Sequence, residues 1–179
     1  MAGQRLTDKS ALTNHTGTGD LYMIVDVSDT TGSSAGTSKK LDSKFVIQTD
    51  KISVSSAEFQ AMDATGGAGT FKTLISAPGS GYMIVPITVT ILANYVSSAD
   101  TTATTLLIGF DTSQVNDYWA RFVRFMRNAT NDLNFHFSSA VDGIATNLDN
   151  APFYLWADQN FNGDFTADVY VTYHIVKLS

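Results

Sequence analysis

The chain has 179 residues, of which 44% are hydrophobic and 16% charged, and its formal net charge is -6 at pH 7. Because it contains no cysteine, thiolate zinc sites, iron–sulfur clusters and cysteine nucleophiles are excluded. A chain of this length buries roughly two-thirds of its unfolded surface on folding, so it needs no metal or disulfide to hold a core together. Its isoelectric point near 4.7 argues against nucleic acid as a partner, since a phosphate-binding surface needs clustered lysine and arginine.

The composition favours strands over helices. The sequence has 22 threonines and 17 serines but a single glutamate, Glu58. Helical surfaces use Glu, Lys and Gln, whereas Thr, Val, Ile, Tyr and Phe suit strands. No stretch approaches the roughly 18 apolar residues of a membrane helix, and residues 1–10 carry charges in place of an apolar leader. We therefore expect a soluble, mostly β protein with no membrane partner.

Residues 1–50 differ in composition and strand content from the rest of the chain. They contain one convincing strand, Leu21–Val27, and residues 28–40 hold no apolar residue larger than alanine. Such a segment cannot bury enough surface to fold alone. We therefore expect an N-terminal arm at 1–50 and a folded domain at 51–179.

The strand at 21–27 predicts a contact surface. A strand without a core of its own exposes unpaired backbone groups, so we expect it to pair with the folded domain or with a neighbouring molecule. The expected interface residues on this strand are Leu21, Tyr22, Ile24, Val25 and Val27.

The segment after the arm predicts a bend and then a short helix. Two β-prone pieces, 45–47 and 52–54, suggest a linker or a strand that changes direction. Ser55 and Glu58 have the spacing of a capping box, in which each side chain bonds to the other residue's backbone N–H. A helix is expected from there to about Asp63.

Strands and turns follow from residue 71. The expected strands, each rich in β-branched or aromatic residues, are 71–76, 82–96, 104–110, 133–137, 153–157 and 165–176. Asn162–Gly163 between the last two is a strong hairpin signal. The fold class expected from this pattern is all-β, a jelly-roll-like β-sandwich with an extended N-terminal arm and one or two short helices.

Alternation within two strands predicts which side chains face the core. In one strand the apolar set is Val85, Ile87, Val89 and Ile91, and in the last it is Val169, Val171, Tyr173 and Ile175. Pro86 lacks a backbone N–H, so it should lie at a sheet edge, a bulge or a strand end.

Residues 118–127 fit two patterns. Helical spacing relates Trp119, Phe122, Val123 and Met126, whereas alternation describes part of the same segment, and we favour a short helix. The arginines of this segment, Arg121, Arg124 and Arg127, are interpreted either as a solvated face or as a contact with the acidic surface of a neighbouring subunit.

One polar motif resembles a calcium loop in its early spacing. Its oxygen-bearing residues are Asp158, Asn160, Asn162 and Asp164. The fit fails at position 12, where Val169 stands in place of a bidentate glutamate. A polar turn explains the same residues, so no metal is expected.

No pattern indicates catalysis. The three histidines, His15, His136 and His174, are isolated from one another and from acidic residues at ligand spacing. We therefore expect no enzyme activity, no catalytic residue and no cofactor.

Two stretches resemble a known group of proteins. Residues 21–41, LYMIVDVSDTTGSSAGTSKKL, with Thr7–Leu12 before them, are similar to the N-terminal segment of tailed-bacteriophage fibre, baseplate and decoration proteins. Residues 73–86, TLISAPGSGYMIVP, with the closing strand 169–176, resemble small phage virion proteins with a jelly-roll body. The resemblance implies a structural protein of the virion, commonly trimeric, whose N-terminal segment attaches to the particle.

The expected function is therefore a capsid-decoration or head-fibre subunit, located in the virion. Its expected partners are its own copies in a homotrimer and the major capsid protein or other virion proteins. One alternative is a tail-fibre, baseplate or adaptor subunit. Another is a carbohydrate-binding receptor-recognition module, in which Tyr154 and Trp156 would stack on sugar rings.

Overall fold

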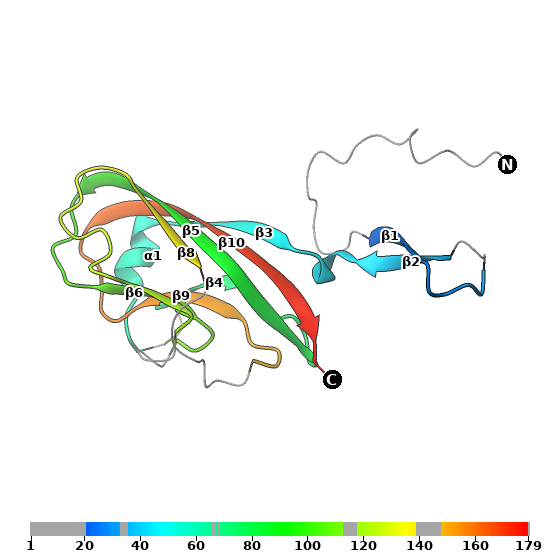
Figure 1. Ribbon diagram of the computed structural model, residues 1–179. Coiled ribbons are helices and arrows are strands. Elements are labelled where there is room, and N and C mark those ends of the chain that lie inside the picture. Colours follow the sequence, from blue (N-terminus) through cyan, green and yellow to red (C-terminus); the bar gives the residue numbers. More distant parts are fainter. Residues whose placement is uncertain are drawn as a thin grey trace. The chain divides into compact units, whose positions relative to one another are not determined.

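The structure, a computed structural model (Figure 1), describes residues 21–32, 36–65, 67, 69–112, 118–138 and 148–178. The chain divides into two compact units, residues 1–45 and 46–179. The division therefore falls just before strand β3, and the boundary expected at residue 50 lies inside that strand.

The described part of the first unit is a β-hairpin. Strands β1 (Leu21–Asp26) and β2 (Thr37–Asp42) pair antiparallel, with Leu21 opposite Asp42, and a short 3-10 turn, η2 (Ser43–Phe45), follows. The arm was expected to contain one strand, yet residues 37–40 belong to a second one, β2. Backbone pairing with β1 does not depend on the large apolar side chains that these residues lack.

The second unit is a sandwich of two four-stranded antiparallel sheets (Figure 1). Its elements are β3 (Gln48–Val54), α1 (Ser56–Ala61), β4 (Phe71–Ile75), β5 (Tyr82–Ser98), β6 (Thr105–Gly109), β7 (Ala120–Val123), β8 (Leu133–Ser138), β9 (Phe153–Ala157) and β10 (Asp164–Lys177). The sheet orders are β3-β10-β5-β8 and β4-β9-β6-β7. Counted within the sandwich, strands one, eight, three and six form one sheet and two, seven, four and five the other, which is the jelly-roll order. The expected fold class is confirmed.

The core lies between the two sheets and follows the alternation of the strands. Val169, Val171, Tyr173 and Ile175 of β10 are all buried, as predicted. In β5 the prediction holds for Val89 and Ile91 but fails for Val85 and Ile87, which are only partly buried. A β-bulge in β5 causes this difference.

Pro86 lies beside that bulge. Thr172 pairs with Thr88 while Tyr173 pairs with Pro86, so one extra residue, Ile87, is inserted into β5. A single inserted residue reverses which side chains face the core. Ile84 is therefore the buried residue before the bulge, and the expected position of Pro86 at a bulge is confirmed.

The capping box predicted at α1 is present. The Glu58 backbone N–H donates to the Ser55 hydroxyl at 3.3 Å, and the Ser55 N–H donates to the Glu58 carboxylate at 2.8 Å. The helix ends at Ala61 because Met62 leaves it in an extended conformation and is buried. In the described part of the chain, no helix is long and apolar enough to cross a membrane.

Three local predictions are wrong. β3 runs straight through Asp50–Lys51 without changing direction. Residues 120–123 form strand β7 rather than a helix, because they pair with β6, with Arg121 opposite Leu107. Asn162–Gly163 is not a hairpin turn, because β9 and β10 belong to different sheets.

Candidate functional site

The first predicted contact surface lies on the N-terminal hairpin. Val27, directly after β1, is 76% exposed. The backbone of the strand that carries Leu21, Tyr22, Ile24 and Val25 is described, but their side chains lie outside the described residues. The strand was expected to pair with the folded domain or a neighbour, whereas its partner is β2 of the same hairpin. A hairpin still leaves one backbone edge open on each strand.

The second predicted surface lies on β7 and the turn that follows it. Arg121 is in β7, and Arg124 and Arg127 follow it in the turn. A strand and a turn therefore carry the three arginines in place of the expected helix. All three are exposed. The Arg121 guanidinium lies 5.0 Å from the centre of the Tyr118 ring. Between Arg121 and Arg124, Val123 is 56% exposed.

The turn has an unusual backbone. Arg124, Met126 and Asn128 have φ angles of 61°, 58° and 58°. The left-handed region costs a non-glycine residue roughly 1–2 kcal/mol, less for asparagine. Such a conformation persists only where the surroundings hold it.

Two anchors hold the turn. The side chains of Phe125 and Met126 are buried in the core. The Phe125 N–H donates to the Thr104 carbonyl at 3.1 Å, and the Asn128 N–H donates to the Asp100 carbonyl at 2.7 Å. Arg124 and Arg127, which flank this buried pair, are both exposed.

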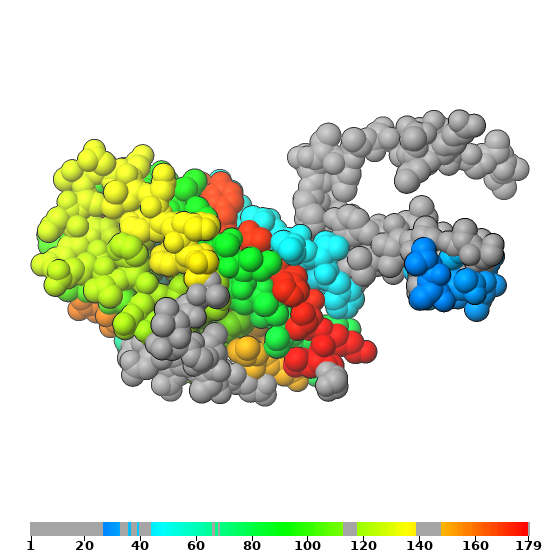
Figure 2. Space-filling model, in the orientation of Figure 1, coloured from blue at the N-terminus to red at the C-terminus, as the bar shows by residue number. Residues whose placement is uncertain are grey.

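The neighbouring edge strand adds apolar surface. The rings of Phe122 in β7 and Phe135 in β8 have centres 4.5 Å apart, which brings the edges of the two sheets together. Leu133 of β8 is 39% exposed. In Figure 2, β8 (yellow) and the segment of β7 and its turn (yellow-green) lie together on the visible face of the sandwich. Exposed apolar groups beside arginines are typical of protein–protein interfaces.

Sequence reasoning missed a buried aspartate that organises the adjoining loops. Asp100 is fully buried, and its carboxylate accepts the N–H groups of Asn162 at 2.9 Å and Gly163 at 3.3 Å and the hydroxyl of Thr102 at 2.6 Å. A buried carboxylate is tolerated when donors surround it in this way. In the sequence it appears only as a polar residue within a threonine-rich turn.

The side chains of the calcium-like motif do not converge. Asp158 accepts the Thr105 N–H, and Asn160 donates to the carbonyls of Gln60 and Met62. Asn162 bonds to Thr101, and Asp164 accepts the Ser97 hydroxyl. Each residue thus ties the connector between β9 and β10 to a different segment. No cluster of three acidic or histidine side chains that could hold a metal occurs among the described residues.

Of the aromatic pair considered for glycan stacking, Trp156 is unsuitable. Trp156 is fully buried against Leu107 and Tyr118 and its ring lies over Gly109, so it offers no face to a sugar. Tyr154 is partly buried, with its ring 4.9 Å from that of Phe71. Burial, with the nearby charge of Asp111, raises the pKa of Tyr154.

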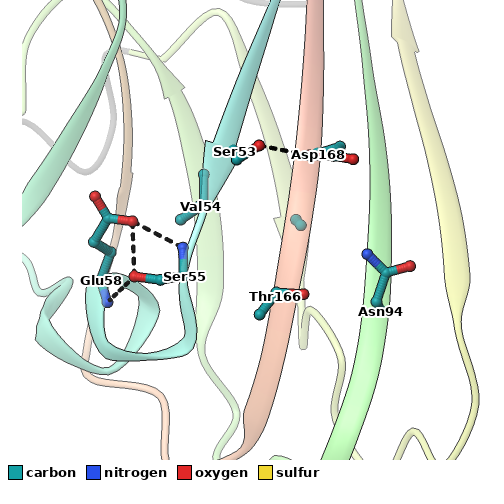
Figure 3. Close-up of a pocket in the computed structure, with 8 residues that line it drawn as sticks. Ser53, Val54, Ser55, Glu58, Asn94, Thr166 and Asp168 are labelled. Carbon is teal, nitrogen blue, oxygen red and sulfur yellow. Dashed lines mark hydrogen bonds between the residues drawn. The ribbon is translucent and has the colours of Figure 1, made fainter.

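A pocket of about 360 Å³ lies at the end of β3 (Figure 3). Its lining includes Asp168 and Glu58. Both carboxylates already have cationic partners, since Lys51 lies 2.9 Å from Asp168 and Lys72 bonds to Glu58. Asp168 also accepts the Ser53 hydroxyl at 2.7 Å, as Figure 3 shows. The bonds from Lys51 and Ser53 hold the pKa of Asp168 below its usual range.

The strand order defines a jelly-roll protein, an architecture that viral capsid domains, lectins and cupins share. No protein-family model and no curated protein matches the chain.

Among solved structures, the chain is similar to one from the acidic stable capsid of Helicobacter pylori bacteriophage KHP30, with a TM-score of 0.40 and 17% identity over 75% of this chain and 94% of that one. It is similar to one from the capsid asymmetric unit of cyanophage Pam1, with a TM-score of 0.39 and 12% identity over 100% of both chains. For Israel acute paralysis virus the TM-score is 0.36 with 12% identity, over 95% of this chain and 96% of that one.

Proposed function

We propose that the protein is a structural subunit of a phage virion, a capsid-decoration or head-fibre protein that assembles as a trimer and has no enzyme activity. The N-terminal unit attaches it to the major capsid protein or to another virion protein. The jelly-roll unit projects from the particle or caps it.

The observation that carries this proposal is the division of the chain. A complete jelly roll, with its own core between two sheets, follows a separate compact unit whose described part is a two-stranded hairpin. An isolated hairpin is at best marginally stable in water, so it gains most by adding its open edges to another sheet. Jelly rolls serve many functions, so the jelly roll alone does not indicate a virion role. Two further features favour that role: the N-terminal unit, and the resemblance of residues 21–41 to phage attachment segments.

Attachment can be tested with the two units separated. Particles that lack this protein are mixed with the full chain or with residues 46–179, and the bound protein is measured after sedimentation. We expect the full chain to bind and residues 46–179 to remain in solution. Full occupancy by residues 46–179 would show that the N-terminal unit is not the attachment segment.

The position of the protein on the particle can be determined with the particles that have bound the full chain. Image reconstruction of decorated particles should place the jelly roll on the head. Density on the tail would replace the decoration role with that of a fibre, baseplate or adaptor subunit.

A further inference from the structure

We infer that strand β1 of one copy of this chain adds to the open edge of β8 in a second copy. The inference rests on the proposed trimer and deepens it by naming the two edges that meet. The N-terminal unit then joins copies to one another as well as attaching them to the particle.

The first support is the charge on the other edge strands of the described chain. Soluble proteins protect sheet edges from unwanted pairing with charged residues, especially lysine, and with bulges or short strands. Four of the six edge strands carry a lysine or an arginine: Lys39 and Lys40 in β2, Lys51 in β3, Lys72 in β4 and Arg121 in β7. In addition, the pairing of β4 is irregular, and β7 is only four residues long.

The strands β8 and β1 lack this protection. β8 has the sequence LNFHFS, with no charged residue and no proline, and it pairs with β5 over its whole length without a bulge. β1 has the sequence LYMIVD and also pairs without a bulge, and its single charged residue, Asp26, stands at its end. Two unprotected edges, each six residues long, favour pairing between copies.

Backbone hydrogen-bonding groups point outwards along β8. The Tyr95 N–H of β5 donates to the Asp132 carboxylate at 2.9 Å, so this N–H points towards the segment that leads into β8. Because backbone groups alternate in direction along a strand, every second residue of β8 directs its N–H and C=O away from β5. No other described strand pairs with that side of β8. By this alternation the outward-pointing residues are Asn134, His136 and Ser138.

The apolar side chains of β8 are incompletely covered. Leu133, Phe135 and Phe137 lie opposite buried residues of β5, yet Leu133 is 39% exposed and both phenylalanines are only partly buried. A further strand beside β8 would cover this apolar edge of the core. The sequence of β1 contains a matching alternate set of apolar residues, Leu21, Met23 and Val25. Burial of apolar area therefore adds to the gain from backbone pairing.

The length of the connecting chain favours a contact between copies. The hairpin leads into β3, which lies at the opposite edge of its sheet from β8. For β1 to reach β8 of the same chain, β2 would lie three strand spacings from β3 to β8 and two more beyond, about 24 Å in all. The chain from Asp42 to Gln48 spans at most about 22 Å when fully extended, and residues 43–45 are coiled into a 3-10 turn. The β8 edge of the same chain is therefore out of reach.

The symmetry of this contact fits a ring. Because β1 and β8 are different surfaces of the same chain, the contact between them is heterologous and continues from copy to copy until it closes. Three copies that close in this way form the proposed trimer. In each copy, the hairpin received from a neighbour extends the sheet β3-β10-β5-β8 by two strands.

The first test places a charge on the open edge of β8 in the full chain. Asn134→Lys is compared with wild type by light scattering after size exclusion across a concentration series. We expect the apparent dissociation constant to rise by about tenfold or more, equivalent to about 1.4 kcal/mol. Thr73→Lys is the matched control, because it adds a lysine at an exposed position of β4, an edge strand that already carries one, and it should leave the constant unchanged. Thermal melts establish that both variants are folded.

The second test identifies the two strands by cross-linking. The chain contains no cysteine, so an introduced thiol is unique. Ile24→Cys in β1 and His136→Cys in β8 are unfolded together in urea, refolded and treated with a bismaleimide. We expect cross-linked pairs in the mixture and none in either variant alone, because each contact joins β1 of one copy to β8 of another. Met23→Cys repeats the test at the adjacent position of β1, and Thr73→Cys in place of His136→Cys should give no pairs.

Each outcome bears on the inference. Cross-links in the β1 variant alone or in the β8 variant alone would show that like edges meet, which overturns it. Unchanged assembly of the folded lysine variant of β8, or a mixture without cross-links at either β1 position, also overturns it. A wild type that is monomeric at every concentration removes both the inference and the proposed trimer. Particle attachment is measured separately with residues 46–179, whereas the cross-links are measured without particles, so the two failures are distinguished.

Discussion

At the scale of single residues, Gly163 shows how a motif can be recognised in a sequence and assigned the wrong cause. Asn162–Gly163 predicted a hairpin because both residues tolerate left-handed backbone. Neither has a positive φ angle here. The glycine is needed because its backbone approaches Asp100, where a Cβ atom would lie 2.6 Å from the Asp100 nitrogen.

Substituting that glycine should therefore be costly. Gly163→Ala would place a methyl group within 2.9 Å of three Asp100 atoms, two of them backbone, and would disturb the hydrogen bonds of the buried carboxylate. We expect the free energy of unfolding, measured in urea, to fall by about 1–3 kcal/mol. Gly67→Ala is the control, since its Cβ would meet only the Thr65 hydroxyl at 3.5 Å, and it should change stability by less than about 0.5 kcal/mol. Equal effects of the two substitutions would contradict this explanation.

Individual carboxylates should also set the response to acid. The pKa of Asp164 is lowered by bonds from the Ser97 and Ser56 hydroxyls, and that of Asp168 by Lys51 and Ser53. A carboxyl group with a lowered folded pKa stabilises the fold above its unfolded pKa and loses that contribution as the pH falls through the folded value. The melting temperature should therefore be steady down to about pH 4 and decline below it.

A serine substitution isolates one of these groups. In Ser97→Ala the pKa of Asp164 moves back towards its unfolded value, so less stability remains to be lost in acid. We expect a shallower decline in melting temperature below about pH 4 than in wild type. Ser98→Ala, at the exposed neighbouring position, should keep the wild-type slope. The assignment to Asp164 fails if the two serine variants decline alike.

At the scale of elements, structure that depends on residues close in sequence was predicted well, whereas structure that depends on strand pairing was not. Helix α1 could be found because a capping box involves only Ser55 and Glu58, which are close in sequence. β7 was taken for a helix because its apolar spacing also fits a helix, and the deciding fact is its pairing with β6, which spacing does not contain. The core-facing residues of β5 before Ile87 were predicted wrongly for the same reason: the bulge that reverses them is set by the register between β5 and β10.

The capping box should contribute measurably to stability. Ser55→Ala removes the acceptor for the Glu58 N–H and a donor to the Glu58 carboxylate. Loss of an N-cap residue costs about 1 kcal/mol in the free energy of unfolding. Ser55→Thr retains the hydroxyl and should recover most of the loss in a urea titration. A Thr variant as unstable as the Ala variant would show that packing, and not capping, sets the effect.

At the scale of the whole molecule, composition and strand count sufficed to predict a jelly roll, whereas the exposure of individual side chains was only partly predictable. Trp156 was wrongly expected to offer its ring to a sugar, because the alternation of β9 tells which residues share a face and not whether another segment covers that face.

The division of the chain yields a prediction that separates the sequence-based boundary from the structural one. Residues 46–179 retain all of β3, whereas residues 51–179 lose Gln48–Asp50, which pair with Val171–Tyr173 of β10. The shorter fragment also loses the buried Gln48 and the hydrogen bond of 2.9 Å from the Tyr173 hydroxyl to Asp50.

We expect residues 46–179 to melt at the temperature of the jelly-roll transition in the full chain, because they contain both sheets and the core between them. Residues 51–179 should be less stable by at least about 2 kcal/mol, since several backbone hydrogen bonds, each worth about 1 kcal/mol net, are lost together with a buried side chain. Calorimetry of the three chains measures both differences. If residues 51–179 melted with residues 46–179, the first half of β3 would contribute nothing to the sandwich, and residue 50 would be the better boundary.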